Sequence, residues 1–320
     1  MNEIIDVADL DVIYLTYNEP KKEEFWLKIQ NMVPWAVRVD GVKGSDAAHK
    51  AAADASETDR FFLIDGDNMP DPAFFNQQLV ITNLNRNAQF RWKALNEING
   101  LMYGNGGMSC WTKQFVYDMK THEASDGSDD TAVEFCYHDD YYAMHDCFST
   151  TYPNATPEQA FRAGFREGVK MCLNKGTRPS LAEFESNVVQ RNYNNLCIWM
   201  SVGADVENGN WARAGAMLGT WTTMIGDTNN DYGLKTWDYR EVQDFDSLSQ
   251  LWKYVGSSTG GGCDALISEL GKGLVHRLGL PIADLDGSAS AFFKSHMRSK
   301  HHNKGINVTE MDVIRGIEGW

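Results

Sequence analysis

The chain has 320 residues, which suffice for one large α/β domain or for a nucleotide-binding domain with a helical appendage. Its formal net charge of −15 argues against a general affinity for nucleic acid, although a local basic groove stays possible. No apolar run reaches the roughly 18 residues that span a membrane, and the acidic N-terminus lacks the features of a signal peptide. Six scattered cysteines without a Cys-x-x-Cys pair indicate reduced thiols, so we expect a cytoplasmic protein without a membrane partner.

The first part of the chain is predicted to alternate strands and helices. Residues 11–16 and 35–39 are predicted to form strands, and the alanine-rich residues 46–55 a helix between the second strand and the third. The unbroken apolar run at 61–64 is typical of a strand buried on both faces, as in parallel sheets. This order of strands and helices predicts the mononucleotide-binding half of an α/β fold.

The third strand runs into Asp65, Gly66 and Asp67. Open α/β sheets bind ligands at the carboxyl ends of their strands, and glycine permits a sharp turn that lets both carboxylates face one point. Two carboxylates suit Mn²⁺ or Mg²⁺ carrying a diphosphate. An acid–glycine–acid sequence is also common in surface turns, so the tripeptide alone leaves that alternative open.

The loop after the first strand contains Tyr17, Asn18 and Glu19, and the second strand ends at Asp40. Asn18 suits a helix N-cap and Pro20 suits the first turn of a helix. The loop is therefore either a strand-to-helix connection alone or also the part of the sheet edge that contacts a nucleotide.

These motifs together resemble family-2-type glycosyltransferases of the GT-A fold. The resemblance rests on T-Y-N-E after the first strand, V-D-G after the second, the helix with His49 and Lys50, and F-F-L-I-D-G-D-N. It implies a Rossmann-like mixed sheet with flanking helices and a metal-dependent transfer from a nucleotide sugar, with a UDP-sugar as the expected donor. It implies that Asp65 and Asp67 bind Mn²⁺ or Mg²⁺ with the diphosphate. The nucleotide-sugar contacts that it implies are Thr16, Tyr17, Asn18, Glu19, Asp40, Lys50, Asp65, Gly66, Gly106 and Gly107.

A nucleotidylyltransferase is the competing nucleotide-sugar fold. That class usually has a glycine-rich basic loop after its first strand, and T-Y-N-E-P-K-K is not such a loop.

Residues 99–108 form the most glycine-dense stretch of the N-terminal half. In GT-A enzymes a small-residue segment at this point lies against the donor sugar and the acceptor, and a structural turn is the alternative. Trp111 follows closely, and we expect it either to contact the acceptor by stacking or to pack in the core.

An acid pair, Asp139 and Asp140, follows a strand predicted at 131–137. Inverting enzymes of the resembled family need a carboxylate here, as the general base that takes the proton of the acceptor hydroxyl. Asp140 is the first candidate and Asp139 the second. A helix N-cap is the alternative, and a retaining enzyme would not need this base.

From Thr156 onward the sequence predicts helices. Thr156 and Pro157 have the residue types of a helix start, and Arg162, Arg166 and Lys170 share one face of that helix. This face is either solvated or in contact with phosphates. Further helices are predicted at 180–202, 205–226, 246–255 and 263–279. We expect a GT-A catalytic domain at 1–155, a C-terminal helical domain at 156–285 and a basic segment at 286–320 that returns to the active site.

The basic stretch at 294–304 contains four lysines and arginines, three histidines and no acid. In GT-A enzymes a C-terminal loop often supplies a histidine to the metal and a cation to the diphosphate. On that resemblance His296 is the first candidate metal ligand, before His276 and His301, and Lys294 and Arg298 are candidate phosphate contacts. Solvation at the surface is the alternative for each of them.

Residues 99–107 and 160–171 resemble glycosyltransferase-like proteins of large tailed bacteriophages, some of which modify hydroxymethylated pyrimidines in DNA. This resemblance implies modified duplex DNA as the acceptor, with the target base flipped out. The alternatives are a surface glycan or another small acceptor, and a non-catalytic sugar-binding protein on the same fold. No obligate protein partner is evident.

Overall fold

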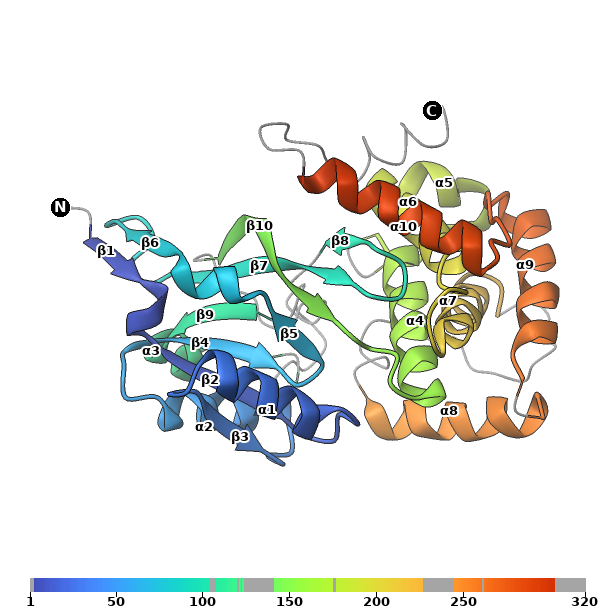
Figure 1. Ribbon diagram of the computed structural model, residues 1–320. Coiled ribbons are helices and arrows are strands. Elements are labelled where there is room, and N and C mark those ends of the chain that lie inside the picture. Colours follow the sequence, from blue (N-terminus) through green and yellow to red (C-terminus); the bar gives the residue numbers. More distant parts are fainter. Residues whose placement is uncertain are drawn as a thin grey trace. The chain divides into compact units, whose positions relative to one another are not determined.

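The computed structural model describes residues 3–103, 108–119, 121, 123, 141–174, 177–226, 244–260 and 262–302. The chain folds into two compact units (Figure 1). The first comprises Met1–Asn96 and Met102–Tyr152, and the second comprises Glu97–Leu101 and Pro153–Trp320. The chain therefore passes between the units three times, and neither unit contains all of its residues in one continuous segment.

The first unit is a mixed α/β structure. The strands of its main sheet are β2 (Asp11–Thr16), β3 (Val37–Asp40), β4 (Arg60–Asp65), β5 (Asn68–Pro70), β7 (Gln89–Asn96), β8 (Met102–Tyr103), β9 (Met108–Thr112) and β10 (Tyr141–Thr151). A separate two-stranded ribbon consists of β1 (Glu3–Asp6) and β6 (Gln78–Ile81). The helices are α1 (Lys22–Met32), α2 (Ser45–Ala55) and α3 (Lys113–Asp118), with 3-10 turns η1 (Val7–Asp9) and η2 (Pro72–Asn76).

The main sheet has the strand order β3-β2-β4-β9-β7-β10-β5, and β8 pairs with β7 beside this path. Strand β2 lies parallel to both β3 and β4, whereas β9 runs antiparallel between β4 and β7. Strand β10 is parallel to β7 and antiparallel to β5. The sheet is therefore mixed, with its parallel βαβ part at the β3 edge.

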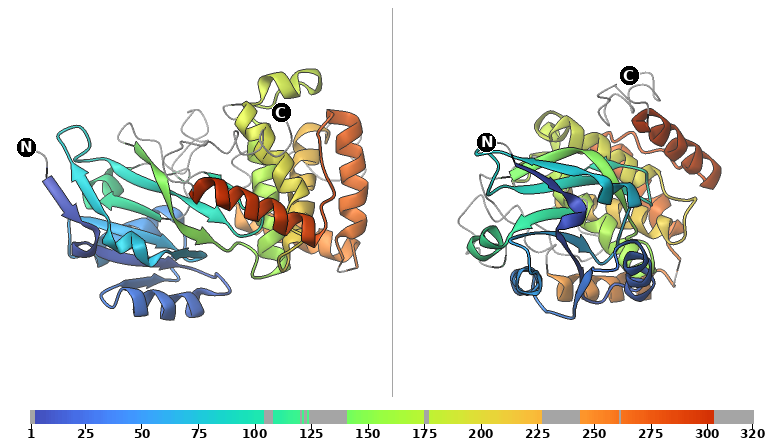
Figure 2. Two further views of the ribbon diagram at one scale, coloured as in Figure 1. Left: turned by 45° about the horizontal axis from the view of Figure 1, so that its top comes forward. Right: turned by 60° about the vertical axis from the view of Figure 1, so that its left-hand side comes forward.

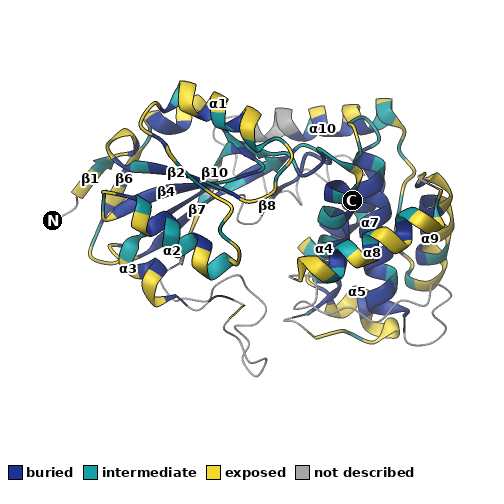
Figure 3. Ribbon diagram, turned by 90° about the horizontal axis from the view of Figure 1, so that it is seen from below, coloured by how far each residue is buried: buried dark blue, intermediate teal, exposed yellow. Residues whose placement is uncertain are grey.

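Helices cover both faces of the parallel strands (Figure 3). On one face, Phe25 and Ile29 of α1 pack in one apolar cluster with Phe62 of β4. On the other face, Ala52 of α2 packs in a second cluster with Leu63 of β4. Because successive side chains of a strand point to opposite faces, the unbroken apolar sequence of β4 supplies both clusters, which confirms its predicted burial.

The first helix begins later than the sequence suggests. The N-cap of α1 is Lys21, so the predicted cap at Asn18 is wrong. The backbone N–H of Lys22 donates to the carbonyl of Glu19 (3.2 Å), which closes a turn just before the helix. This turn delays helical geometry until after Pro20 and lengthens the loop at the sheet edge.

The second unit contains helices gathered in a bundle (Figure 2). They are α4 (Pro157–Cys172), α5 (Phe184–Asn187), α6 (Gln190–Ser201), α7 (Gly209–Met224), α8 (Phe245–Ser258), α9 (Asp264–Leu278) and α10 (Gly287–His302), with a 3-10 turn η5 (Leu181–Glu183). The Thr156 hydroxyl accepts the backbone N–H of Gln159 (3.1 Å), which confirms the predicted cap of α4. Among the described residues, no helix is both long enough and apolar enough to cross a bilayer.

Helices α4 and α7 pack backbone against backbone through glycines. A Cβ atom on Gly164 would lie 1.9 Å from the carbonyl oxygen of Ala212, and one on Gly215 would lie 2.2 Å from that of Phe161. Both distances are far below van der Waals contact, so only glycine fits at these crossing points. The close approach in turn lets α4 and α7 form the centre of the bundle.

Replacing Gly164 by Ala is expected to lower the free energy of unfolding of the second unit by roughly 3 kcal/mol, because the new methyl group overpacks the α4–α7 contact. Gly256 in α8 is the matched control, since no described atom lies within 4 Å of a Cβ placed there. Gly256→Ala should stabilise the protein by about 0.5–1 kcal/mol through the higher helix propensity of alanine. Urea unfolding followed by circular dichroism measures both, and equal effects of the two substitutions would contradict this packing.

Candidate functional site

The candidate site lies where three neighbouring parallel strands end. In the register of the sheet, Thr16 at the end of β2 pairs with Asp40 at the end of β3. The preceding residue of β2, Leu15, pairs with Asp65 at the end of β4. Parallel strands end at the same edge, which is where open α/β sheets bind ligands. The structure thus brings together residues that lie far apart in the sequence.

The turn from Asp65 to Asp67 is held through two successive carbonyl groups. The hydroxyl of Tyr14 donates to the carbonyl of Gly66 (2.8 Å), and the backbone N–H of Tyr152 donates to that of Asp67 (2.8 Å). Strand β5 begins directly after the turn, at Asn68. The two acids therefore project from a backbone that is fixed on both sides.

Glu19 places a third carboxylate beside this turn. A Cβ atom on Gly66 would lie 2.5 Å from Oε2 of Glu19, so glycine at this position leaves the room that the carboxylate occupies. The same oxygen accepts the backbone N–H of Tyr17 (2.8 Å), which ties Glu19 to the first loop. The first loop and the acid pair are therefore neighbours, as the sequence predicts.

The pKa of Asp65 is raised to about 7. Burial is the main cause, the negative charges of Asp67 and Glu19 add to the rise, and Arg91 opposes it. Asp65 and Asp67 are each half-buried as whole residues. A carboxyl group whose negative charge is poorly compensated is typical of a functional site, and a bound cation would compensate it.

The acid pair fits a hard divalent cation. Mg²⁺ and Mn²⁺ prefer oxygen ligands, and Mg²⁺ commonly takes only one or two carboxylates from the protein while it keeps waters and substrate phosphates. Across the residues that the structure describes, no group of three or more His, Cys, Asp or Glu side chains is arranged to hold a metal ion. Asp65 and Asp67 would therefore hold the ion together with water or substrate oxygens.

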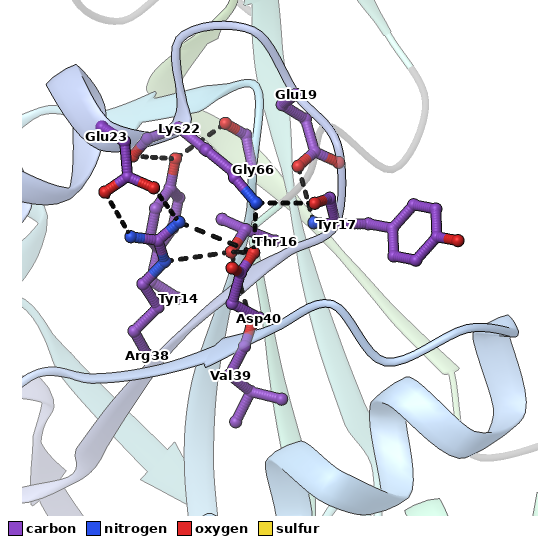
Figure 4. A network of polar contacts seen from close by, with 10 residues as sticks. All are labelled: Tyr14, Thr16, Tyr17, Glu19, Lys22, Glu23, Arg38, Val39, Asp40 and Gly66. Carbon is purple, nitrogen blue, oxygen red and sulfur yellow. Dashed lines mark hydrogen bonds and ion pairs between the residues drawn. The ribbon is translucent and has the colours of Figure 1, made fainter.

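Asp40 is fixed by donors on one of its two carboxylate oxygens (Figure 4). The Thr16 hydroxyl and the Lys22 ammonium group each donate to Oδ1 (2.7 Å for both), and the Arg38 guanidinium lies 3.5 Å from the same oxygen. In the described part of the chain, no donor bonds Oδ2 of Asp40. This exposed oxygen can therefore accept a hydrogen bond from a ligand.

Lys22 and Arg38 connect Asp40 to the first loop and to α1. Lys22 also donates to the carbonyl of Tyr17 (2.7 Å), and Arg38 forms two 2.7 Å bonds with Glu23. Sequence analysis did not identify either cation. Arg38 lies two positions before Asp40 on the same strand face, and that alternation was the available signal. Lys22 gave no comparable signal, because the late start of α1 decides where it points.

The environment keeps Asp40 ionised. Partial burial acts to raise its pKa, but the hydrogen bonds from Lys22 and Thr16 outweigh this, and the pKa is lowered overall. The neighbouring Tyr17 ring is 46% exposed, and Figure 4 shows it pointing away from Asp40. A negative acceptor and an open aromatic ring thus flank the first loop. Both features suit a nucleoside.

Two further predicted contacts have partners within the first unit. Lys50 forms an ion pair with Asp46 one helical turn earlier on α2 (2.7 Å). Trp111 is fully buried, with its ring centroid 5.5 Å from that of His49 and 5.4 Å from that of Phe115. The predicted acceptor contact at Trp111 is therefore wrong, because β9 places this side chain in the core beneath α2 and α3.

The cationic face of α4 belongs to the second unit. The guanidinium groups of Arg162 and Arg166 lie over the ring of Phe245, at 4.5 Å and 5.5 Å from its centroid, and Lys170 forms an ion pair with Glu167. All three cations are partly exposed. Their proposed contact with phosphates stays a prediction.

Lys294 in α10 is buried, with 4% of its surface exposed. Its ammonium group lies 2.6 Å from a carboxylate oxygen of Asp205 and donates to the carbonyl of Glu97 (2.9 Å). The predicted phosphate contact is therefore wrong, because this lysine instead compensates a partly buried carboxylate. His296 on the same helix stacks with Phe292, with ring centroids 6.3 Å apart, and His276 is exposed near the end of α9.

Gly106, Gly107, Asp139 and Asp140 lie outside the described residues, and so does the side chain of Arg298. The roles expected for them stay predictions.

Comparisons with known proteins find no match for this chain among protein-family models, curated proteins or solved structures. Function therefore has to be inferred from the geometry of the site. Its main features are the aligned strand ends, the acid pair and the donors around Asp40.

Replacing Asp65 by Asn is expected to change how stability depends on pH. The pKa of Asp65 is about 7 in the folded protein and about 3.9 in an unfolded chain. The folded state therefore binds the extra proton between these values, and the free energy of unfolding falls as the pH rises from about 4 to about 7. Asparagine should remove this fall and leave the variant more stable than the wild type at pH 8, by roughly 1–3 kcal/mol.

Urea unfolding in EDTA between pH 5 and pH 8 measures this effect. Asp40→Asn is the control, because the lowered pKa of Asp40 places its titration below this pH range, so the substitution should leave the pH slope between pH 5 and pH 8 unchanged. Equal pH slopes in the wild type and in Asp65→Asn would contradict the raised pKa.

Replacing Lys294 by Met is expected to lower the free energy of unfolding by roughly 3 kcal/mol, because it leaves Asp205 without its cation. Lys28→Met in α1 is the control, since the exposed pair with Glu24 contributes at most about 0.5 kcal/mol. Urea unfolding measures both variants, and an equal loss of stability in the two would contradict the role of Lys294 as the partner of Asp205.

Proposed function

We propose that this protein is a metal-dependent glycosyltransferase that takes its sugar from a nucleotide-sugar donor, with a GT-A arrangement of the first unit. The observation that carries the proposal is the acid pair at the end of β4, one strand away from the Thr16–Asp40 pair. Asp40 at the end of β3 and the acid pair at the end of β4 are separated by strand β2. Such a pair of sites suits a nucleoside diphosphate, because its nucleoside needs hydrogen-bond partners and its phosphates need a cation. The parallel order of β3, β2 and β4, followed by antiparallel β9, supports the assignment.

The first loop would bind the nucleoside. Oδ2 of Asp40 would accept from a ribose hydroxyl or from the N–H of a uracil base, while Oδ1 stays engaged with Thr16 and Lys22. The exposed Tyr17 ring offers a surface on which a base can stack. A hydrogen-bond acceptor that stays ionised at neutral pH favours a ligand with donors, as every nucleoside is, and the choice of uridine follows from the resemblance.

Asp65 and Asp67 would hold Mn²⁺ or Mg²⁺ against the diphosphate. When bound, the cation compensates the negative charge that develops on the departing diphosphate. Asp65 must lose its proton to bind a cation, so its raised pKa makes occupancy of the site depend on pH near neutrality.

The acceptor follows from the resemblance rather than from the described residues. We propose a hydroxyl acceptor, with the hydroxymethyl group of a modified pyrimidine in duplex DNA as the first to test. Asp140, or Asp139, would take the proton of that hydroxyl if the transfer inverts the anomeric centre. The partly exposed Arg162, Arg166 and Lys170 offer contacts to phosphates.

Asp65→Asn is expected to reduce metal-dependent turnover of UDP-sugars at least about 100-fold, because the variant loses a charged cation ligand while it keeps the shape of the side chain. Turnover is measured with Mn²⁺ and radiolabelled UDP-sugars, offered with duplex DNA that carries or lacks 5-hydroxymethylcytosine. Asp54→Asn is the control, since Asp54 is an exposed acid of the same unit that bonds the hydroxyl of Tyr117.

The outcomes separate the reaction from the acceptor. Label that enters only the modified DNA, and that is lost with Asp65→Asn, supports both. Hydrolysis of the donor without transfer to DNA supports the glycosyltransferase and rejects the DNA acceptor. No turnover or metal-dependent binding of any UDP-sugar rejects the proposed function.

A further inference from the structure

The carbonyl group between the two acids is held by one buried side chain. Tyr14 lies in β2, none of its surface is exposed, and its hydroxyl donates to the carbonyl of Gly66 at 2.8 Å. The other carbonyl in reach, that of Lys22, is 3.4 Å away. A tyrosine has one O–H to donate, so the shorter contact to Gly66 is the main hydrogen bond.

Tyr14 is itself held firmly. Its backbone pairs with Arg38 of β3 on one side and Ile64 of β4 on the other. Its ring stacks on that of Trp26 in α1, with centroids 6.0 Å apart and an angle of 1° between the planes (the hydroxyl and its neighbours are shown in Figure 4). A hydroxyl on a stacked ring of a central strand has little freedom, so the carbonyl that it bonds is restrained as well.

The turn requires an anchor because negative charges gather around it. Oε2 of Glu19 lies only 2.5 Å from where a Cβ atom of Gly66 would stand, so three carboxylates gather at this turn with Asp65 and Asp67 on either side of the glycine, and like charges repel one another. A tyrosine hydroxyl keeps its proton at neutral pH, so Tyr14 stays a donor. The hydrogen bond to Gly66 therefore persists in the conditions in which the acids are charged.

We propose that Tyr14 is a positioning residue that fixes the peptide group joining Gly66 to Asp67. It thereby sets the affinity of the turn from Asp65 to Asp67 for a divalent cation. The inference rests on the proposed function, because it concerns the same acid pair. The orientation of this peptide group determines the direction in which Asp67 leaves the turn. The backbone N–H of Tyr152 bonds the next carbonyl, that of Asp67. The turn is therefore held at two successive carbonyls, one by the side chain of Tyr14 and one by the backbone of Tyr152.

Tyr14→Phe tests this role, because it removes the hydroxyl and keeps the ring that stacks on Trp26. We expect Mn²⁺ to bind about 10-fold more weakly, the effect typical of losing a partner that orients metal ligands. The Kd is measured on the full-length protein with Mn²⁺ alone, from the electron paramagnetic resonance signal of the free ion. Tyr117→Phe is the matched control, since it removes a hydroxyl bonded to Asp54 in the same unit and should leave the Kd unchanged.

The competing outcomes are distinct. A Tyr14→Phe protein with the wild-type Kd overturns the positioning role and leaves the proposed function standing. A Tyr14→Phe protein that no longer folds also overturns it, because the hydroxyl would then hold the core rather than the turn. If the wild type shows no Mn²⁺ binding that Asp65→Asn removes, the proposed cation site and the role of Tyr14 fail together. Circular dichroism melting of all variants separates a change in fold from a change in affinity.

Discussion

The parallel register of β3, β2 and β4 is the constraint on which the site depends. Backbone ladders hold Thr16 opposite Asp40 and Leu15 opposite Asp65, so the acids of two strands reach one edge of the sheet. A slip by one residue would turn every side chain of a strand to the opposite face. Helices cover both faces here and each has its own apolar cluster, so such a slip would expose core residues on two sides. The position of the acids is therefore secured by burial elsewhere in the strands.

Two carboxylates on this edge have opposite electrostatic environments. Asp40 receives hydrogen bonds from a lysine and a threonine, and its pKa is lowered. Asp65 is half-buried beside other acids, and its pKa is raised to about 7. Asp40 stays ionised and can accept hydrogen bonds as an anion. The environment of Asp65 destabilises its negative charge, and a proton or a bound cation would compensate that charge. This difference is what suits one strand end to recognition and the other to metal binding.

Much of the parallel half of the fold could be predicted from the sequence, because its signals are local. The apolar runs of β2 and β4 and the alanine-rich α2 agree with their predicted positions within one residue. Strand β9 could not be predicted in this way, since five residues next to a glycine-rich stretch become a strand only by pairing with β4 and β7. The predicted order of strands was enough to place the acid pair near the first loop. It did not show that Thr16 and Lys22 donate hydrogen bonds to Asp40.

The basic stretch shows a second reason for failure. Composition indicates that residues 294–304 are cationic, but it does not indicate which cation has a partner within the fold. Lys294 meets Asp205 because α10 packs beside the segment at 205, a contact between residues far apart in sequence. The same limit applies to Trp111, whose burial depends on β9 and on helices that precede and follow it. Residue type left Trp111 between an acceptor contact and the core, and it indicated a phosphate contact or solvation for Lys294. Tertiary contacts place both side chains in the interior.

Residues 97–101 make the helical unit discontinuous in sequence. Residues 98–101 are fully buried in the helical unit although their neighbours on both sides belong to the sheet unit, and Lys294 bonds the carbonyl of Glu97. A gene fragment that begins at residue 153 would encode the helices without this part of their core. The helical unit is therefore not an appended domain that one continuous segment of the chain supplies. The segment between β7 and β8 makes the core of the helical unit depend on residues from the N-terminal half of the chain.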